Sequence, residues 1–234
     1  MVQRKSICDS VVDSVLEKIR TKELKPGDKL PNEIEMAEEY GVSRISLREA
    51  LRSLAAKGLI ITKHGEGSFI NEYHPEMLAE TLNSISLLDE TPILEMLQLR
   101  KIIETEAARL CAVNASDEEL NQILYYKNER EKYCRLKQTD CTMKKKYEMD
   151  KLFHMSIAKG SHNEIFIKFI ETIHYTIDIH QRRTSTTQNQ AENSSYYHSA
   201  IADALLAHDG DRAASSMYAH LNNVEQNFSA AMKK

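Results

Sequence analysis

KPGDKLPNEIEMAEEYGVSRISLREALRSLAAKG, residues 25–58, contains the signals for two short helices joined by a tight turn. Asn32 is a favoured N-cap and stands three residues before Glu35, as in a capping box. Gly41 supplies a helix stop, and Ser43 caps the helix that follows. The pattern therefore predicts a helix, a glycine turn and a second helix.

The second of these helices has an apolar stripe beside a basic one. Its apolar residues recur at helical spacing, and its arginines occupy neighbouring positions. The two stripes consist of Leu47, Ala50, Leu51 and Leu54, and of Arg44, Arg48 and Arg52. The net charge of the whole chain is -4, which by itself argues against a polyanion partner. Residues 43–64 nevertheless hold five cationic residues against Glu49 alone, and a local basic patch is what phosphate binding needs.

A predicted hairpin follows the helix pair. In GLIITKHGEGSFI, residues 58–70, two strand-forming runs flank a glycine-bracketed turn with Lys63 and His64 at its tip. An amphipathic helix from Ile7 to about Lys22 precedes the pair. An arginine stripe alone is typical of a solvated helix face. Because the helix pair, the arginines and the basic hairpin agree, we predict a winged helix-turn-helix that binds DNA.

Residues 25–70 resemble the winged-helix domain of the GntR family of bacterial regulators. The usual pattern of that family is P-G-x-x-L-P-S-E-R-E-L-A, then V-S-R-x-x-V-R-E-A-L, then G-x-G-x-F-V. The resemblance implies that the recognition helix reaches guanine edges, phosphates or the DNA backbone, and that the wing enters the minor groove. The implied contact residues are Arg44, Ser46 and Arg48 in the helix and His64 and Gly65 in the wing. Ile34 stands where the family usually has an arginine, so one expected DNA contact is missing.

Length and composition predict a mostly α, two-domain protein. The chain has 234 residues, seven Gly and four Pro, and 28% of its residues are charged. We expect a DNA-binding domain over 1–72, a helical linker over 73–91 and an antiparallel helical bundle over 92–232. The polar stretch 182–195 predicts a mobile loop within this bundle. No apolar run is long enough to cross a membrane, and four cysteines without a C-x-x-C pair suit reduced thiols, so the sequence predicts a cytoplasmic protein.

Four residues of the second domain are spaced as metal ligands. Asp150 and His154, in DKLFH, are four positions apart and share one helical face. Such a pair alone is more often an ordinary hydrogen-bonded arrangement. However, His198 and His220 each lie about eleven residues from a DGD turn, so an antiparallel helical hairpin brings them level with each other. Three imidazoles and one carboxylate suit one divalent ion such as Zn, Ni, Co or Mn.

Residues 92–228 also resemble the all-helical ligand-sensing (FCD) domain of the FadR-type branch of GntR regulators. In that branch D-x-x-F-H, H-x-x-I-x-x-A-I and A-x-x-x-M-x-x-H-L mark the metal ligands, and this chain has DKLFH, HSAIADAL and AASSMYAHL at the matching places. The resemblance thus implies the same four ligands. It also implies that Arg100, in R-x-x-x-E, faces an effector. The alternative for Arg100 is an i,i+4 ion pair with Glu104.

Two functions are compatible with these patterns. The first is a transcription regulator, expected to be a repressor, which binds a palindromic double-stranded operator as a homodimer. A small carboxylate effector would bind beside the metal, with Arg100 neutralising it. The second is a helical metalloenzyme with a DNA-binding appendage, since three histidines and an aspartate could activate water. The chain has no H-E-x-x-H or nucleophile motif, so we expect a regulator and not an enzyme.

Overall fold

The computed structural model describes residues 6–72, 74–86, 92–137, 139–184 and 191–232. The chain divides into two compact units, Met1–His74 and Pro75–Lys234. The predicted fold class is confirmed, because the described residues form helices and one antiparallel hairpin. Among these residues, none of the helices combines the length and the apolar character that crossing a membrane requires.

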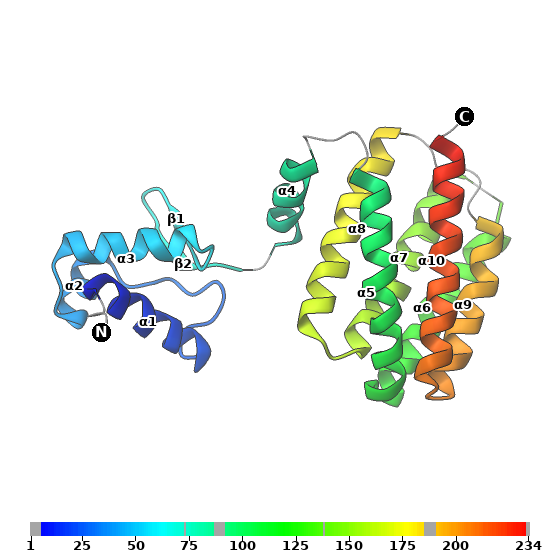
Figure 1. The fold of residues 1–234 in the computed structure, drawn as a ribbon, viewed down its shortest axis with the longest axis horizontal. Helices are drawn as coiled ribbons and strands as arrows, with labels where there is room; N and C mark the ends of the chain where they lie inside the picture. The colour runs from blue at the N-terminus through cyan, green and yellow to red at the C-terminus, as the bar shows by residue number, and fades with distance from the viewer. Residues whose placement is uncertain (1–5, 73, 87–91, 138, 185–190, 233–234) are drawn as a thin grey trace, which may run out of the picture. The chain divides into compact units, whose positions relative to one another are not determined.

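The N-terminal unit is a winged helix-turn-helix (Figure 1). Its elements are α1 (Ile7–Arg20), α2 (Glu33–Tyr40), α3 (Arg44–Ala56), β1 (Ile60–Lys63) and β2 (Gly67–Ile70). The two strands pair in an antiparallel register that joins Ile60 to Ile70 and Lys63 to Gly67. The wing turn therefore consists of residues 64–66, as the glycine spacing predicts.

Local capping explains where α2 begins and ends and where α3 begins. The Asn32 side chain accepts hydrogen bonds from the backbone N–H groups of Ile34 (2.9 Å) and Glu35 (3.0 Å), and Glu35 accepts one from the Asn32 N–H (3.1 Å). Gly41 ends α2 with φ at 64°, in the left-handed region where glycine has no steric cost. Ser43 caps α3 by accepting from the backbone N–H of Ser46.

The core of this unit buries one face of α3. Leu47 and Leu54 are fully buried against α1 and the strands. The buried cluster consists of Val11, Val12, Val15, Leu30, Met36, Ala37, Leu47, Ala50, Leu51, Leu54, Ile60 and Ile70. Because this stripe lies on one side of α3, the opposite side of the helix carries its exposed residues.

The C-terminal unit is a helical bundle. Figure 1 shows α5 to α10 running up and down side by side, with α4 next to α8. The helices are α4 (Pro75–Ser86), α5 (Pro92–Asn114), α6 (Asp117–Arg135), α7 (Asp140–Gly160), α8 (Glu164–Thr184), α9 (Ala191–Leu206) and α10 (Gly210–Met232). Helix α4 lies within the predicted linker 73–91 and packs against α8. Helix α5 contacts α7, α8, α9 and α10, so it is central to the bundle.

The predicted loop over 182–195 is wrong at both ends. Helix α8 continues to Thr184 and α9 begins at Ala191, while residues 185–190 lie outside the described residues. The stretch is polar but contains neither Gly nor Pro. With no strong helix breaker, the polar residues at each end continue the adjoining helices.

Candidate metal centre and candidate nucleic-acid interface

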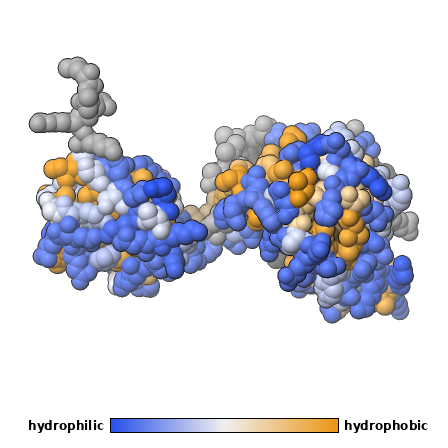
Figure 2. Space-filling view, turned by 90° about the horizontal axis from the view of Figure 1, so that it is seen from below, coloured by the Kyte–Doolittle hydropathy of each residue, from blue (hydrophilic) through white to orange (hydrophobic). Residues whose placement is uncertain are grey.

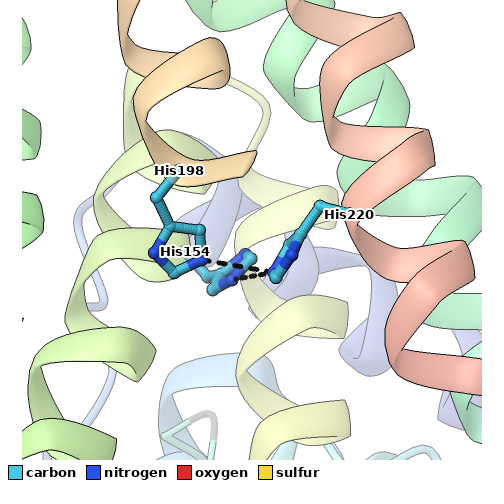
Figure 3. Close-up of side chains that lie close together, drawn as sticks. All are labelled: His154, His198 and His220. Atoms are coloured by element: carbon cyan, nitrogen blue, oxygen red, sulfur yellow. Dashed lines mark hydrogen bonds between the residues drawn. The ribbon is translucent and has the colours of Figure 1, made fainter. Parts of the chain in front are cut away.

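Three histidines from three helices meet inside the bundle. His154 comes from α7, His198 from α9 and His220 from α10, and their rings point toward one another (Figure 3). The Nε2 atom of His220 lies 3.2 Å from that of His198 and 3.3 Å from that of His154. All three side chains are buried, with at most 2% of each residue exposed. One nitrogen from each histidine lies within 4.8 Å of the others, as a shared ion requires.

The nitrogen spacing fits a bound transition metal. Two imidazole nitrogens at about 2.0–2.1 Å from one tetrahedral ion lie roughly 3.3 Å apart. The two Nε2 distances match this value without movement of a helix. Among the described residues, the Nδ1 atoms of His198 and His220 have no hydrogen-bond partner. Buried imidazole nitrogens this close to each other are costly unless a proton or a cation lies between them.

Glu104 of α5 supports the first of these histidines. Its Oε2 atom lies 2.5 Å from His154 Nδ1, and its Oε1 atom accepts a hydrogen bond from Arg100 Nε, also at 2.5 Å. A carboxylate at Nδ1 favours the tautomer that carries its proton there, which leaves the lone pair of Nε2 facing the other histidines. The sequence does not indicate this role of Glu104, because the R-x-x-x-E spacing points only to the pair with Arg100.

Asp150 lies beside the three histidines but is paired with a different residue. Its Oδ1 atom is 3.7 Å from His198 Nε2 and accepts a hydrogen bond of 2.6 Å from Arg130 Nε of α6. Arg130 is buried, and its Nη1 also donates to Ser195 Oγ. The structure thus brings three of the four predicted ligands together and places the carboxylate of the fourth at the edge of the group.

Burial sets the protonation state of the cluster. It is the main cause that lowers the pKa of His198 and that of His220, the latter to about 3, and a neighbouring histidine adds to both effects. Burial by itself would raise the pKa of Glu104, but the Arg100 guanidinium together with the contacts to His154 and His174 outweighs it and holds that pKa well below its usual value. These shifts keep His198 and His220 neutral and Glu104 ionised, and a neutral imidazole is the form that binds a metal.

Two further residues extend the cluster, His174 of α8 and Arg100 of α5. The ring of His174 lies 5.9 Å from that of His154, and its Nε2 is 3.5 Å from Glu104 Oε1. Burial lowers the pKa of His174 to about 4. Arg100 forms the alternative ion pair with Glu104, yet its Nη2 has no hydrogen-bond partner among the described residues. His174 has no partner at a ligand spacing in the sequence, so no local pattern indicates its place beside Glu104.

The predicted DNA contacts lie on α3 and the wing. Arg44 and Arg48 are exposed in the first turns of α3, and Arg48 Nε donates to Glu33 Oε2 of α2 at 2.7 Å. Ser46 is partly exposed next to them, with its hydroxyl 2.9 Å from that of Ser43.

At the wing tip, His64 and Gly65 are both exposed. Gly65 adopts a φ of 77°, in the left-handed region that glycine enters without steric cost because it has no side chain. The Nζ atom of Lys63 lies 5.0 Å from the centre of the Phe69 ring. This cation–π contact places a positive charge beside the aromatic ring on the wing.

Comparison with known proteins identifies the family. Residues 8–70 match the family described as bacterial regulatory proteins, gntR family, and residues 95–223 match the FCD domain. The HTH-type transcriptional regulator LutR of Bacillus subtilis is 31% identical over 217 residues, which cover 88% of this chain and 94% of LutR. The chain belongs to the GntR family of bacterial regulatory proteins, with an FCD domain.

Other GntR-family proteins agree with this assignment. The HTH-type transcriptional repressor NanR of an Enterobacter species is 28% identical over 232 residues, covering 97% of this chain and 87% of NanR. A solved structure of a Streptococcus agalactiae GntR protein has a TM-score of 0.71 and 24% identity, covers 94% of this chain and 99% of that protein, and so has the same fold. The family and these relatives are transcription regulators and not enzymes.

Proposed function

We propose that this GntR-family protein is a repressor released by a small carboxylate effector, which binds beside a divalent metal in the FCD domain. The observation that carries the proposal is the meeting of three buried imidazoles at metal-ligand spacing, with an unpaired guanidinium nitrogen on a neighbouring helix. The name of NanR as a repressor supports the direction of regulation.

His154, His198 and His220 would hold the ion, and Asp150 would be the fourth ligand. The Asp150 carboxylate accepts a hydrogen bond from Arg130, so to bind the ion it would have to turn from that guanidinium toward the histidines. A bound divalent ion such as Zn, Ni, Co or Mn supplies a Lewis-acidic position that prefers nitrogen and carboxylate donors. The donor set fits this group of ions and does not distinguish among them.

Arg100 would orient the effector. Its Nε is held by Glu104, so the guanidinium is fixed, and its free Nη2 is a donor for a carboxylate oxygen. A small carboxylate suits this arrangement, because one of its oxygens can bind the ion while another accepts a hydrogen bond from the guanidinium. The buried position of Arg100 would strengthen that charge-assisted hydrogen bond relative to one in water.

DNA binding would use the N-terminal unit in a homodimer. We assign the operator contacts to Arg44, Ser46 and Arg48 of α3 and to His64 and Gly65 of the wing, all of which are at least partly exposed. A symmetric dimer would place two such units on a palindromic double-stranded site. Effector binding would then change operator affinity by altering the arrangement of the two DNA-binding units.

One set of variants tests both metal binding and the response to a carboxylate effector. Tag-free wild type, His198→Ala and the control His162→Asn are compared by elemental analysis after exposure to Zn, Ni, Co or Mn. A thermal-shift screen of small carboxylic acids follows, in which an acid at about a hundred times its Kd adds about 2.7 kcal/mol of stability. We expect His198→Ala to lose metal and the acid response while DNA binding survives. A wild type that takes up no metal would show that the histidines are only a buried polar cluster.

A further inference from the structure

An exposed isoleucine stands at the start of the recognition helix. Ile45 is the second residue of α3, between Arg44 and Ser46, and 74% of its surface is exposed. Successive helical residues turn by about 100°, so Ile45 lies nearly opposite the fully buried Leu47. Ile45 therefore projects away from the core of the unit, on the side where α3 carries its exposed cations.

A single exposed apolar residue has no special meaning on most surfaces. Figure 2 shows a visible face of the N-terminal unit that is mainly hydrophilic, with hydrophobic spots. The position of Ile45 is different, because the first residues of a recognition helix meet base edges in the major groove. Arg44 and Arg48, on either side of it in the sequence, supply the positive charge that brings this end of α3 to DNA.

The neighbouring polar groups leave Ile45 with a distinct role. Arg48 is oriented by Glu33, and the Ser46 hydroxyl lies 2.9 Å from the Ser43 hydroxyl. Ile45 has no hydrogen-bonding group and can discriminate bases only by apolar contact. In the major groove only thymine presents a methyl group, at its C5 position.

We propose that Ile45 recognises a thymine C5-methyl group in each half of the operator. Ile34, the second residue of α2, is 52% exposed and adds a second apolar side chain to the helix pair, next to the Glu33 that holds Arg48. The inference rests on the proposed contacts of α3 with the major groove. It adds a base preference that the arginines alone do not give.

The test uses uracil, which is thymine without the methyl group. Duplexes are first selected from a randomised palindromic library with the full-length wild type. Each thymine of the selected site is then replaced by uracil in both half-sites, and affinity is measured at one fixed salt concentration. We expect one thymine position at which each lost methyl weakens binding about fourfold, the equivalent of about 0.8 kcal/mol.

Two variants decide which residue reads the methyl. Ile45→Ser should bind the thymine and uracil duplexes equally, because the serine side chain has no methyl group and loses the apolar contact. The matched control Ile7→Ser changes another exposed isoleucine of the same unit, 61% exposed, and should keep the wild-type preference for thymine.

Each outcome has one interpretation. The inference is overturned if no thymine in the selected site is sensitive to uracil, or if Ile45→Ser keeps the full uracil penalty. Failure of the wild type to select any sequence would instead count against the proposed contacts of α3 as a whole, and the inference would fall with them.

Discussion

The carboxylate of Glu104 connects the candidate metal centre to the candidate effector contact. One oxygen lies against His154 Nδ1 and the other against Arg100 Nε, each at 2.5 Å, on a side chain that is 1% exposed. A ligand that enters the cluster and shifts Arg100 would therefore also act on His154. This single side chain is a short physical link between the candidate metal centre and the candidate effector contact.

Replacement of Glu104 tests that link. Glu104→Gln keeps the shape but removes the charge that fixes the tautomer of His154, and loss of such a supporting group typically weakens metal affinity by about 10–100-fold. Titration with zinc against a chelating dye measures the change. Glu106→Gln, on the exposed side of the same helix, should leave affinity unchanged. Equal affinity in both variants would show that Glu104 does not orient the ligand.

The buried histidines predict how stability depends on pH. The folded protein holds the pKa of His220 at about 3 and that of His174 at about 4, whereas an unfolded chain has values near 6.5. Between these limits the unfolded chain binds more protons, so the free energy of unfolding falls as pH drops below about 6.5.

The free energy of unfolding should fall by about 1.4 kcal/mol per pH unit for each histidine that stays neutral in the folded protein. Urea unfolding of metal-free protein between pH 6.5 and 5 measures it, above the range where most carboxylates titrate. His174→Leu removes one of these histidines and should reduce the slope by about that amount. A profile that is flat in this window for the wild type would contradict the buried, neutral state.

Two arginines of α3 carry the base and phosphate contacts that we propose. Arg44→Ala and Arg48→Ala should each cost about 1–3 kcal/mol on the selected site if the side chain binds a base edge. Arg48 is held by Glu33 at 2.7 Å, so its geometry is set before DNA arrives. Fluorescence anisotropy at fixed salt measures both. Unchanged operator affinity in both variants would show that these two arginines do not contact the operator.

At the scale of elements, the end of α7 packs unusually close to α5. A Cβ atom added to Gly160 would lie 2.6 Å from Cys111 Sγ and 3.1 Å from Ala115 Cβ. Both neighbours are buried in the main core cluster of the bundle. The absence of a side chain at Gly160 is therefore what allows α7, with His154 and Asp150, to lie against α5, with Arg100 and Glu104.

Overpacking at this contact tests how it stabilises the bundle. Gly160→Ala should destabilise the protein by about 1–3 kcal/mol, measured by urea unfolding. The cost should be smaller in a Cys111→Ala background, because the nearest atom is then absent. An equal cost in both backgrounds would mean that the clash with Cys111 is not the cause.

At the scale of the whole molecule, we expect a homodimer. One winged helix contacts too few base pairs for selective binding, and a symmetric pair on a palindrome is the commonest solution. Light scattering should give twice the mass of one chain for the free protein, and that mass plus the mass of one duplex for the complex. A monomer in both states would contradict the proposal, and halving the palindrome should then have no effect on affinity.

The sequence by itself determined the features that depend on near neighbours. Asn32, Gly41 and Ser43 fix the helix-turn-helix because caps and left-handed stops involve residues within a few positions. His198 and His220 were placed opposite each other by counting from one turn, because a helical hairpin has a fixed rise per residue.

Only the tertiary structure decided what lies around those histidines. Glu104 on α5, His174 on α8 and Arg130 on α6 reach the site from helices whose mutual packing no local pattern specifies. The shared helical face of Asp150 and His154 predicted two equal ligands, but α6 brings Arg130 within 2.6 Å of the carboxylate and not of the imidazole. A buried charge pairs with whichever opposite charge packing brings nearest, and that choice is made when the bundle assembles.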